Sequence, residues 1–138
     1  MRAEKVINAL LKNASALTAL LAGGSSNAIY GGGQLPQGTA LPACVVEHVV
    51  TNELTTIDAN AAFGLMRTRI QVTVLAKDYP TQKAVLEQVR IACNYQRGLI
   101  ASVRVVSVLR DNVGPDLRDD DMQVYTQSID FQVTYQEP

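Results

Sequence analysis

The sequence is poor in the residues that many enzymes and metal-binding proteins depend on. Its 138 residues contain no tryptophan, one histidine and two cysteines, and aromatic residues make up 5% of the chain. A structural zinc site takes four Cys or His ligands, so these three side chains are too few to form one. Two cysteines also cannot supply the disulfide framework of a small secreted domain. We therefore expect no metal and no cofactor.

The chain also lacks an excess of charge of either sign. Twelve Lys and Arg residues stand against thirteen Asp and Glu residues, for a formal net charge of −1. Proteins that bind DNA or RNA tightly present many basic groups to phosphates, and this balance excludes that footprint. The scarcity of aromatic rings argues against a stacking surface for single-stranded bases.

Long apolar runs are missing as well. No segment approaches the roughly 20 apolar residues of a membrane-spanning helix. The apolar stretch after the basic start is interrupted by Asn8, Lys12 and Asn13, unlike that of a signal peptide. We expect a protein made in a reducing cytoplasm, with Cys44 and Cys93 as free buried thiols.

What the chain does contain is a regular alternation of helix and strand patterns. Apolar residues recur at helical spacing in residues 6–14 and 85–93, with Asp78 as the N-cap of the second helix and Arg97 and Gly98 at its end. Strand patterns cover residues 43–51, 65–76, 102–110 and 123–135, and a short strand is expected at 28–30. The predicted fold is a single α+β domain over residues 1–138, in the order α-β-β-α-β-β. It has a mixed, mostly antiparallel sheet of about four strands, with two helices on one face.

No arrangement of side chains predicts catalysis. Cys44 and His48 lie four residues apart on one strand, which separates them by roughly 13 Å. A nucleophile and its base need hydrogen-bond contact, so these two cannot form a pair. The glycine-rich loop at residues 31–38 lacks the Gly-Lys-Ser/Thr of a phosphate-binding loop.

Two loops of about a dozen residues, 52–64 and 111–121, are candidates for function because loops of that length are often functional. The second carries five acids, too closely bunched for a calcium loop and without its closing Glu. It is either a solvated hairpin tip or a charged contact or lumen-facing element of an assembly. Its candidate residues are Asp111, Asp116, Arg118, Asp119, Asp120 and Asp121. Candidates for an interface on the first loop and the polar strand face are Asn52, Glu53, Phe63, Arg67 and Arg69.

The order and spacing of these segments resemble the tail-completion or tail-terminator proteins of long-tailed bacteriophages. No single motif is specific, but the matching segments run through most of the chain. They are Leu20-Leu21-Ala22-Gly23, Ile29-Tyr30-Gly31, residues 36–42, Arg67-Thr68-Arg69-Ile70-Gln71-Val72, residues 76–79, residues 85–90 of the predicted second helix, and residues 128–135.

The resemblance implies a structural protein of the virion tail at the head–tail junction, without catalytic residues. Members of the family form a hexameric ring on the head-proximal end of the tail tube, stop its growth and join the tail to the head connector. The implied partners are copies of the same chain, the tail tube protein and the connector, with DNA passing through the lumen without specific binding. An acidic loop at 111–121 could line that lumen.

Two alternatives remain open from the residues. One is another phage neck or connector subunit. The other is a small cytoplasmic α+β enzyme or ligand-binding domain, with His48, Cys93 and the Asp cluster as its only plausible polar participants.

Overall fold

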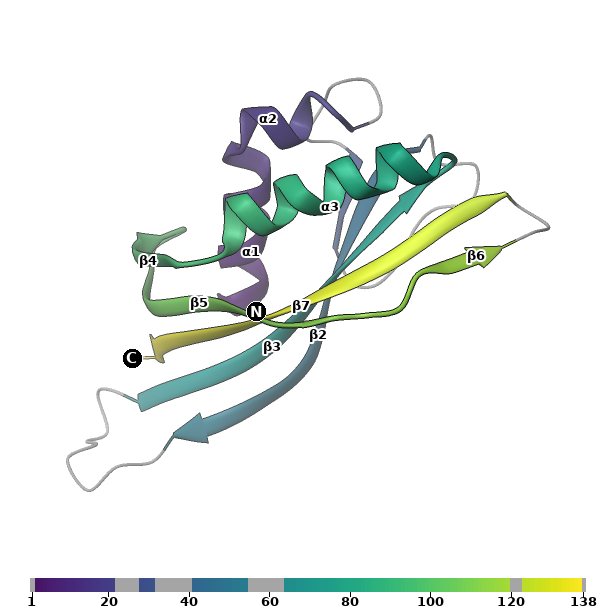
Figure 1. Cartoon of the computed structure of the whole chain (residues 1–138). Coiled ribbons are helices and arrows are strands. Elements are labelled where there is room, and N and C mark those ends of the chain that lie inside the picture. The colour runs from purple at the N-terminus through teal and green to yellow at the C-terminus, as the bar shows by residue number, and fades with distance from the viewer. Residues whose placement is uncertain (1, 22–27, 32–40, 55–63, 120–122, 138) are drawn as a thin grey trace.

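The computed structural model describes residues 2–21, 28–31, 41–54, 64–119 and 123–137. These residues form three helices and seven strands (Figure 1). The helices are α1 (Arg2–Asn13), α2 (Ser15–Thr18) and α3 (Tyr79–Cys93). The strands are β1 (Ile29–Tyr30), β2 (Ala43–Leu54), β3 (Gly64–Ala76), β4 (Gln96–Ile100), β5 (Val103–Val113), β6 (Leu117–Asp119) and β7 (Val124–Glu137).

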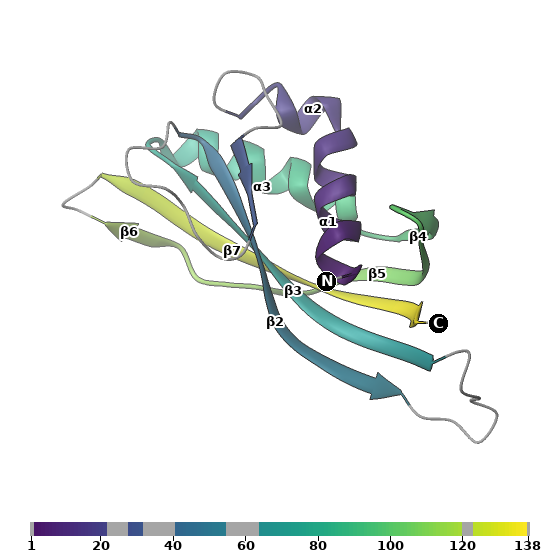
Figure 2. The same ribbon diagram turned by 180° about the vertical axis from the view of Figure 1, so that it is seen from behind.

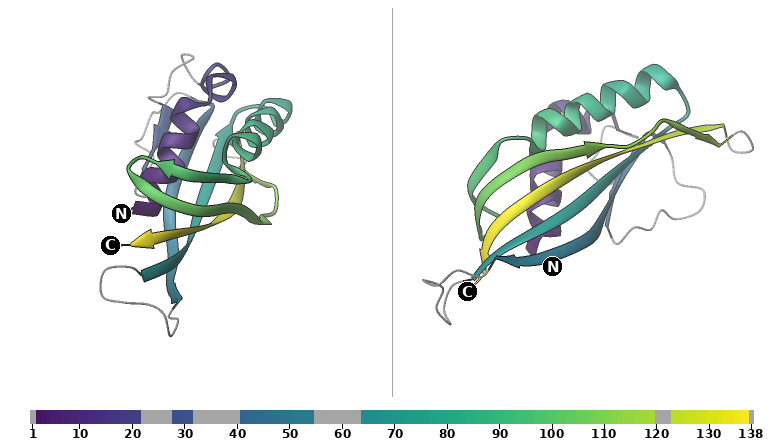
Figure 3. Two further views of the ribbon diagram at one scale, coloured as in Figure 1. Left: turned by 90° about the vertical axis from the view of Figure 1, so that its left-hand side faces the viewer. Right: turned by 60° about the horizontal axis from the view of Figure 1, so that its bottom comes forward.

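All seven strands belong to one sheet in the order β1-β2-β3-β7-β5-β4, and β6 also pairs with β7. Only β1 runs parallel to its neighbour, β2, and the remaining pairs are antiparallel. The last strand of the chain therefore lies in the middle of the sheet. The sheet is long and strongly curved, as the end-on view in Figure 3 shows.

The expected four-stranded sheet with two helices is wrong: the described part of the chain has a seven-stranded, curled sheet and a third, short helix. Two of the additional strands lie where the sequence pattern favoured turns. Residues near Gly98 were expected to end a helix but form β4, and three residues of the expected acidic loop form β6. Both strands owe their pairing to distant partners rather than to their own composition, which is why local patterns miss them.

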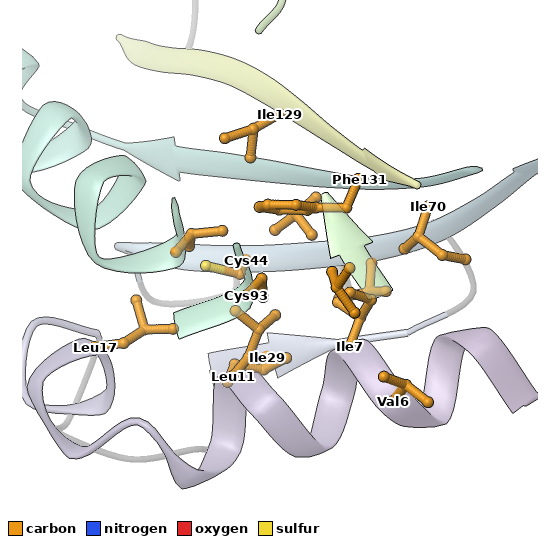
Figure 4. Close-up of a cluster of buried hydrophobic side chains, with 14 of the residues drawn as sticks. Val6, Ile7, Leu11, Leu17, Ile29, Cys44, Ile70, Cys93, Ile129 and Phe131 are labelled. Atoms are coloured by element: carbon orange, nitrogen blue, oxygen red, sulfur yellow. The ribbon is translucent and has the colours of Figure 1, made fainter. Parts of the chain in front are cut away.

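The helices lie together on one face of the sheet, the helix face, as the opposite views in Figures 1 and 2 show. Alternate residues of the central strands point into this layer, among them Ile70 of β3 and Phe131 of β7, both fully buried. They pack in one cluster with Ile7 and Leu11 of α1 (Figure 4). This layer of apolar side chains is the core of the fold.

The opposite face, the open face, carries mostly polar side chains. On β3 these are Arg67, Arg69, Gln71 and Thr73, and they face polar residues of β7. The Thr73 hydroxyl lies 2.9 Å from that of Ser128 across the two strands. The period-2 alternation of residues 65–76 predicts this division between a buried and a wetter face, and it is confirmed.

The predicted start of α3 is confirmed at Asp78. This residue has an extended backbone immediately before the helix, and Pro80 occupies the first turn. The Asp78 carboxylate does not cap a backbone amide but accepts a hydrogen bond from the Thr81 hydroxyl at 3.0 Å. The buried stripe that follows, Val85, Leu86, Val89 and Cys93, faces the sheet.

The β4–β5 hairpin departs from the usual residue preferences. Ile100 pairs with Val103, so the turn consists of Ala101 and Ser102, whose φ angles are +51° and +65°. Such two-residue turns strongly prefer Asn-Gly, because positive φ is costly for a residue with an ordinary side chain. Gly98, at φ +104°, lies where the pairing of β4 with β5 shifts register, a conformation that glycine allows.

We predict that the double change Ala101→Asn and Ser102→Gly stabilises the protein. The strain at two left-handed residues should be relieved by about 1 kcal/mol, which raises Tm by roughly 2–8 °C in a chain of this size. Thermal unfolding followed by circular dichroism measures the shift. Ala101→Val should lower Tm, and a double variant no more stable than the wild type would contradict the turn conformation.

Candidate functional site

The acidic segment is held against β7. Residues 111–113 are the end of β5, residues 117–119 form β6, and both pair with β7. Between them the Gly114 amide donates a 2.8 Å hydrogen bond to the Ser128 carbonyl. A Cβ at position 114 would lie 3.4 Å from that oxygen, which is an ordinary van der Waals contact. We call residues 110–119 the acidic arm.

An ion cluster on the open face is the first anchor of the acidic arm. Arg69 of β3 forms an ion pair with Asp111, and its Nε lies 3.3 Å from Asp130 Oδ2 without hydrogen-bond geometry. Partial burial raises the pKa of Asp130; the positive charge of Arg69 opposes this rise and the carboxylate of Asp111 adds to it. One guanidinium thus bridges two carboxylates that would otherwise repel each other.

A second anchor connects the arm to α3. Lys83 Nζ lies 2.6 Å from Asp116 Oδ1 and also donates to the Gln127 side-chain oxygen. The Gln127 amide in turn donates to the Gly114 carbonyl at 2.8 Å. A single lysine therefore joins helix, arm and central strand.

Aromatic rings surround this second anchor. Tyr79 and Tyr125 meet edge to face with their centroids 5.9 Å apart. The Lys83 ammonium lies 5.1 Å from the centre of the Tyr79 ring, and the Arg118 guanidinium lies 5.4 Å from that of Tyr125. Cations over aromatic faces are attracted by the ring electrons, so these contacts add to the ion pair of Lys83.

The structure brings together two candidates that the sequence assigned to different sites. Arg69 of the polar strand face and Asp111 of the acidic segment form one ion pair. Arg67 lies exposed on the same face, and Asn52 and Glu53 lie exposed near the end of β2. These last three residues make no contact with the acidic arm among the described interactions.

The side chains of four other candidate residues are not described by the structure. Phe63, Asp120 and Asp121 lie outside the described residues, and Asp119 is placed only by its backbone, which pairs with Val124.

Sequence reasoning missed the partners that anchor the arm, which are Lys83, Gln127, Asp130, Tyr79 and Tyr125. Only the position of Asp130 on the polar side of a strand was a signal.

The thiols are buried in the core, and the histidine forms a hydrogen bond within its own strand. Cys44 and Cys93 are free and fully buried, as predicted, and lie near each other in the core (Figure 4). Burial raises the pKa of Cys44 to about 12 and raises that of Cys93 as well, which keeps both as unreactive thiols. His48 Nε2 is 2.6 Å from the Thr51 hydroxyl, on the same strand.

Within the described segments, no three His, Cys, Asp or Glu side chains come together as a set that could bind a metal ion. None of the helices in the part of the chain that the structure describes has the length and apolarity needed to cross a membrane. The arrangement that stands out is thus an ordered, charged surface built on paired strands.

A model of one protein family, "Tail completion protein gp17", matches residues 5–136. The chain belongs to this family. It is therefore a structural protein of the bacteriophage virion tail, as the resemblance in the sequence predicts.

A solved structure gives the fold an independent match. A chain described as "Virion of native gene transfer agent (GTA) particle" superposes with a TM-score of 0.69 at 15% sequence identity. The match covers 97% of the present chain and 94% of the other. At that identity the likeness establishes the shared fold. No curated protein matches the sequence closely enough to count as a relative.

The Arg69 cluster predicts a pH-dependent loss of stability. Arg69→Gln leaves the carboxylates of Asp111 and Asp130 facing each other, which should lower the free energy of unfolding by about 1 kcal/mol at pH 7. Burial already raises the pKa of Asp130, and loss of the opposing Arg69 charge should raise it further, so the deficit should grow as the pH rises through that pKa and shrink near pH 4. Urea unfolding at several pH values measures it.

Arg67→Gln is the matched control, because Arg67 lies on the same strand and face but is exposed. It should change stability little at any pH. A deficit of Arg69→Gln that stays constant between pH 4 and pH 7 would contradict the electrostatic role of the cluster.

Proposed function

We propose that the chain forms a ring of six copies, the number that the family resemblance implies, at the head-proximal end of the tail tube. The ring ends tube growth and offers the surface to which the head connector binds. The observation that carries this proposal is the family match over residues 5–136, nearly the whole length. The 138 residues would then act as one domain whose partners are its own copies, the tail tube protein and the connector.

The ordered acidic arm supports an assembly role. A surface that must meet a partner in one orientation gains from being rigid before contact, because less conformational freedom is lost on binding. Two anchors, Arg69 and Lys83, hold this arm on β7 from both faces of the sheet. The role proposed for the chain is structural and includes no catalysis.

Tube capping is the direct test. Purified protein added to growing tail tubes should shorten them and stop further addition of tube subunits, with the protein at one end in negative-stain images. Native mass spectrometry of the capped ends should give one ring of fixed copy number. A chain that stays monomeric and never binds tube ends would overturn the proposal. Binding to the connector but not to the tube would favour the neck-subunit alternative.

The acidic arm also bears on the passage of DNA. Asp111 and Asp116 are engaged by Arg69 and Lys83, so their charge is largely neutralised where it lies. The acids that follow in the sequence, at 119–121, are the better candidates for a negative lumen wall. Such a wall would repel the phosphates of passing DNA and keep the DNA from adhering.

We predict that Asp119→Asn, Asp120→Asn and Asp121→Asn together leave rings and tube capping intact but slow DNA ejection. Loss of the repulsion should also make the slowing stronger at low salt, where electrostatic interactions have longer range. Ejection kinetics of reconstituted particles measure the effect, and Glu87→Gln on the outer surface of α3 is the control. Ejection at the wild-type rate would remove the acids from the lumen.

A further inference from the structure

The sheet ends in two open edges. On one side β1 pairs only with Cys44 and Val45 of β2, and no described strand pairs with the outer edge of β2 from Val46 to its end. On the other side β4 is the last strand, and its outer edge has no described partner. An open edge presents unpaired backbone groups that can hydrogen-bond a further strand.

Neither edge carries the lysine or proline residues that often prevent such pairing. Lysine and proline are absent from β4 and from residues 46–54 of β2. Instead both edges expose apolar side chains. Val49 and Val50 of β2 are 46% and 43% exposed, and Leu99 of β4 is 75% exposed. Val49 lies where the register of β2 with β3 shifts, and it has no partner on β3. Exposed apolar groups at an unpaired edge are typical of a contact with another protein chain.

The two edges carry opposite charge. The charged residues of β2 are Glu47 and Glu53, and no lysine or arginine lies on that strand. From Gln96 to Val108 the charged residues are Arg97 and Arg104, and no acid lies among them. Arg104 is the pairing partner of Leu99, which puts both arginines at the β4 end of the sheet. Two like edges would repel each other, whereas unlike edges attract.

The β4 end also offers a place for an apolar side chain. An open recess of about 390 Å³ lies there, lined by Gly98, Leu99, Arg104, Val105, Val106 and Gln136. It begins at β4, extends across β5 to Gln136 of β7, and has apolar as well as basic walls. An apolar, acid-flanked strand such as β2 matches it in both respects.

We propose that the β4 edge of one copy binds the β2 edge of the next, with Val49 and Val50 packed at the recess beside Gly98. Because one chain carries both complementary edges, its partner is a second copy in a head-to-tail contact. Such contacts form a closed ring when the rotation between copies closes. The inference names the contact within the ring and so rests on the proposed function.

Charge reversal at one edge at a time tests the contact. An all-acidic variant carries Arg97→Glu and Arg104→Glu, and an all-basic variant carries Glu47→Arg and Glu53→Arg. Each variant alone has two like-charged edges, so its assembly on tail tubes should fall at least about tenfold. An equal mixture of the two should assemble again, because each β4 edge then meets a β2 edge of opposite charge. Native mass spectrometry should find the two variants in alternation, in equal numbers.

The mixture also serves as the folding control, since a misfolded variant could not be rescued by the other. A further control variant, Lys12→Glu with Lys77→Glu, changes the net charge as much as the all-acidic variant does, at exposed positions away from both edges. It should assemble like the wild type. Failure of the control, or failure of the mixture to recover, would overturn the edge contact.

Disulfide cross-linking gives a second measurement. With Leu99→Cys and Val50→Cys in one chain, oxidation should link copies into a ladder, since the native thiols are buried. Ile91→Cys with Val50→Cys, on the exposed side of α3, should give no ladder. Wild-type rings that form and cap tubes without this cross-link would overturn the contact but leave the proposed function standing. A wild-type chain that neither assembles nor caps tubes would overturn the proposed function itself.

Discussion

The pairing of β7 on both of its sides is the constraint on which the rest of the structure depends. Its inner side chains, such as Ile129 and Phe131, form the middle of the core under the helices. One of its edges pairs with β3 along the length of that strand, and the other pairs with β5 and then β6. The last strand in the sequence is therefore the one that brings the two halves of the chain together. The β3–β7 and β5–β7 pairings have to wait until the whole chain is present, which makes this a fold of mostly non-local contacts.

The charged surface follows from that central position. Arg69 and Asp111 lie on strands that do not pair with each other, and they meet because β7 holds both strands. Each of these ion pairs is partly exposed, and such pairs contribute little to the total free energy of folding. Their effect is directional: Arg69 on the open face and Lys83 from α3 fix the acidic arm along β7. The arm is thus held by backbone pairing and oriented by charge.

Local patterns in the sequence predicted those elements whose signals are local. The stripe from Val85 to Cys93 with Asp78 before it predicted α3, and the alternation of residues 65–76 predicted β3. β4 was missed because Gly98 was taken for the end of a helix, whereas it is a positive-φ residue within a strand. The real turn is made by Ala101 and Ser102, which lack the Asn or Gly that such a two-residue turn prefers.

The candidate site was also predicted only as far as its signals are local in the sequence. The sequence singled out Asp111 and Arg69 separately, because clustered acids and an alternating polar face are visible in one dimension. Their contact depends on the register of three strands, which no local pattern contains. Lys83 lies before the apolar stripe of its helix, and only the path of the acidic arm brings Asp116 within reach of it.

The near-neutral net charge of the chain is the sum of regions of opposite charge, which lie at different edges of the sheet. A chain with twelve basic and thirteen acidic residues has no large field to bring copies together or to hold them apart. What remains is the local arrangement, with acids on the β2 edge and arginines at the β4 end. If these edges bind each other as proposed, each added copy forms a contact between one β2 edge and one β4 edge. One free edge of each kind then remains, at opposite ends of the growing chain. Growth then stops only when the first and last copies meet. Where the rotation between copies closes, a head-to-tail contact of this kind gives a ring, in which every copy has both of these edges bound to a neighbour.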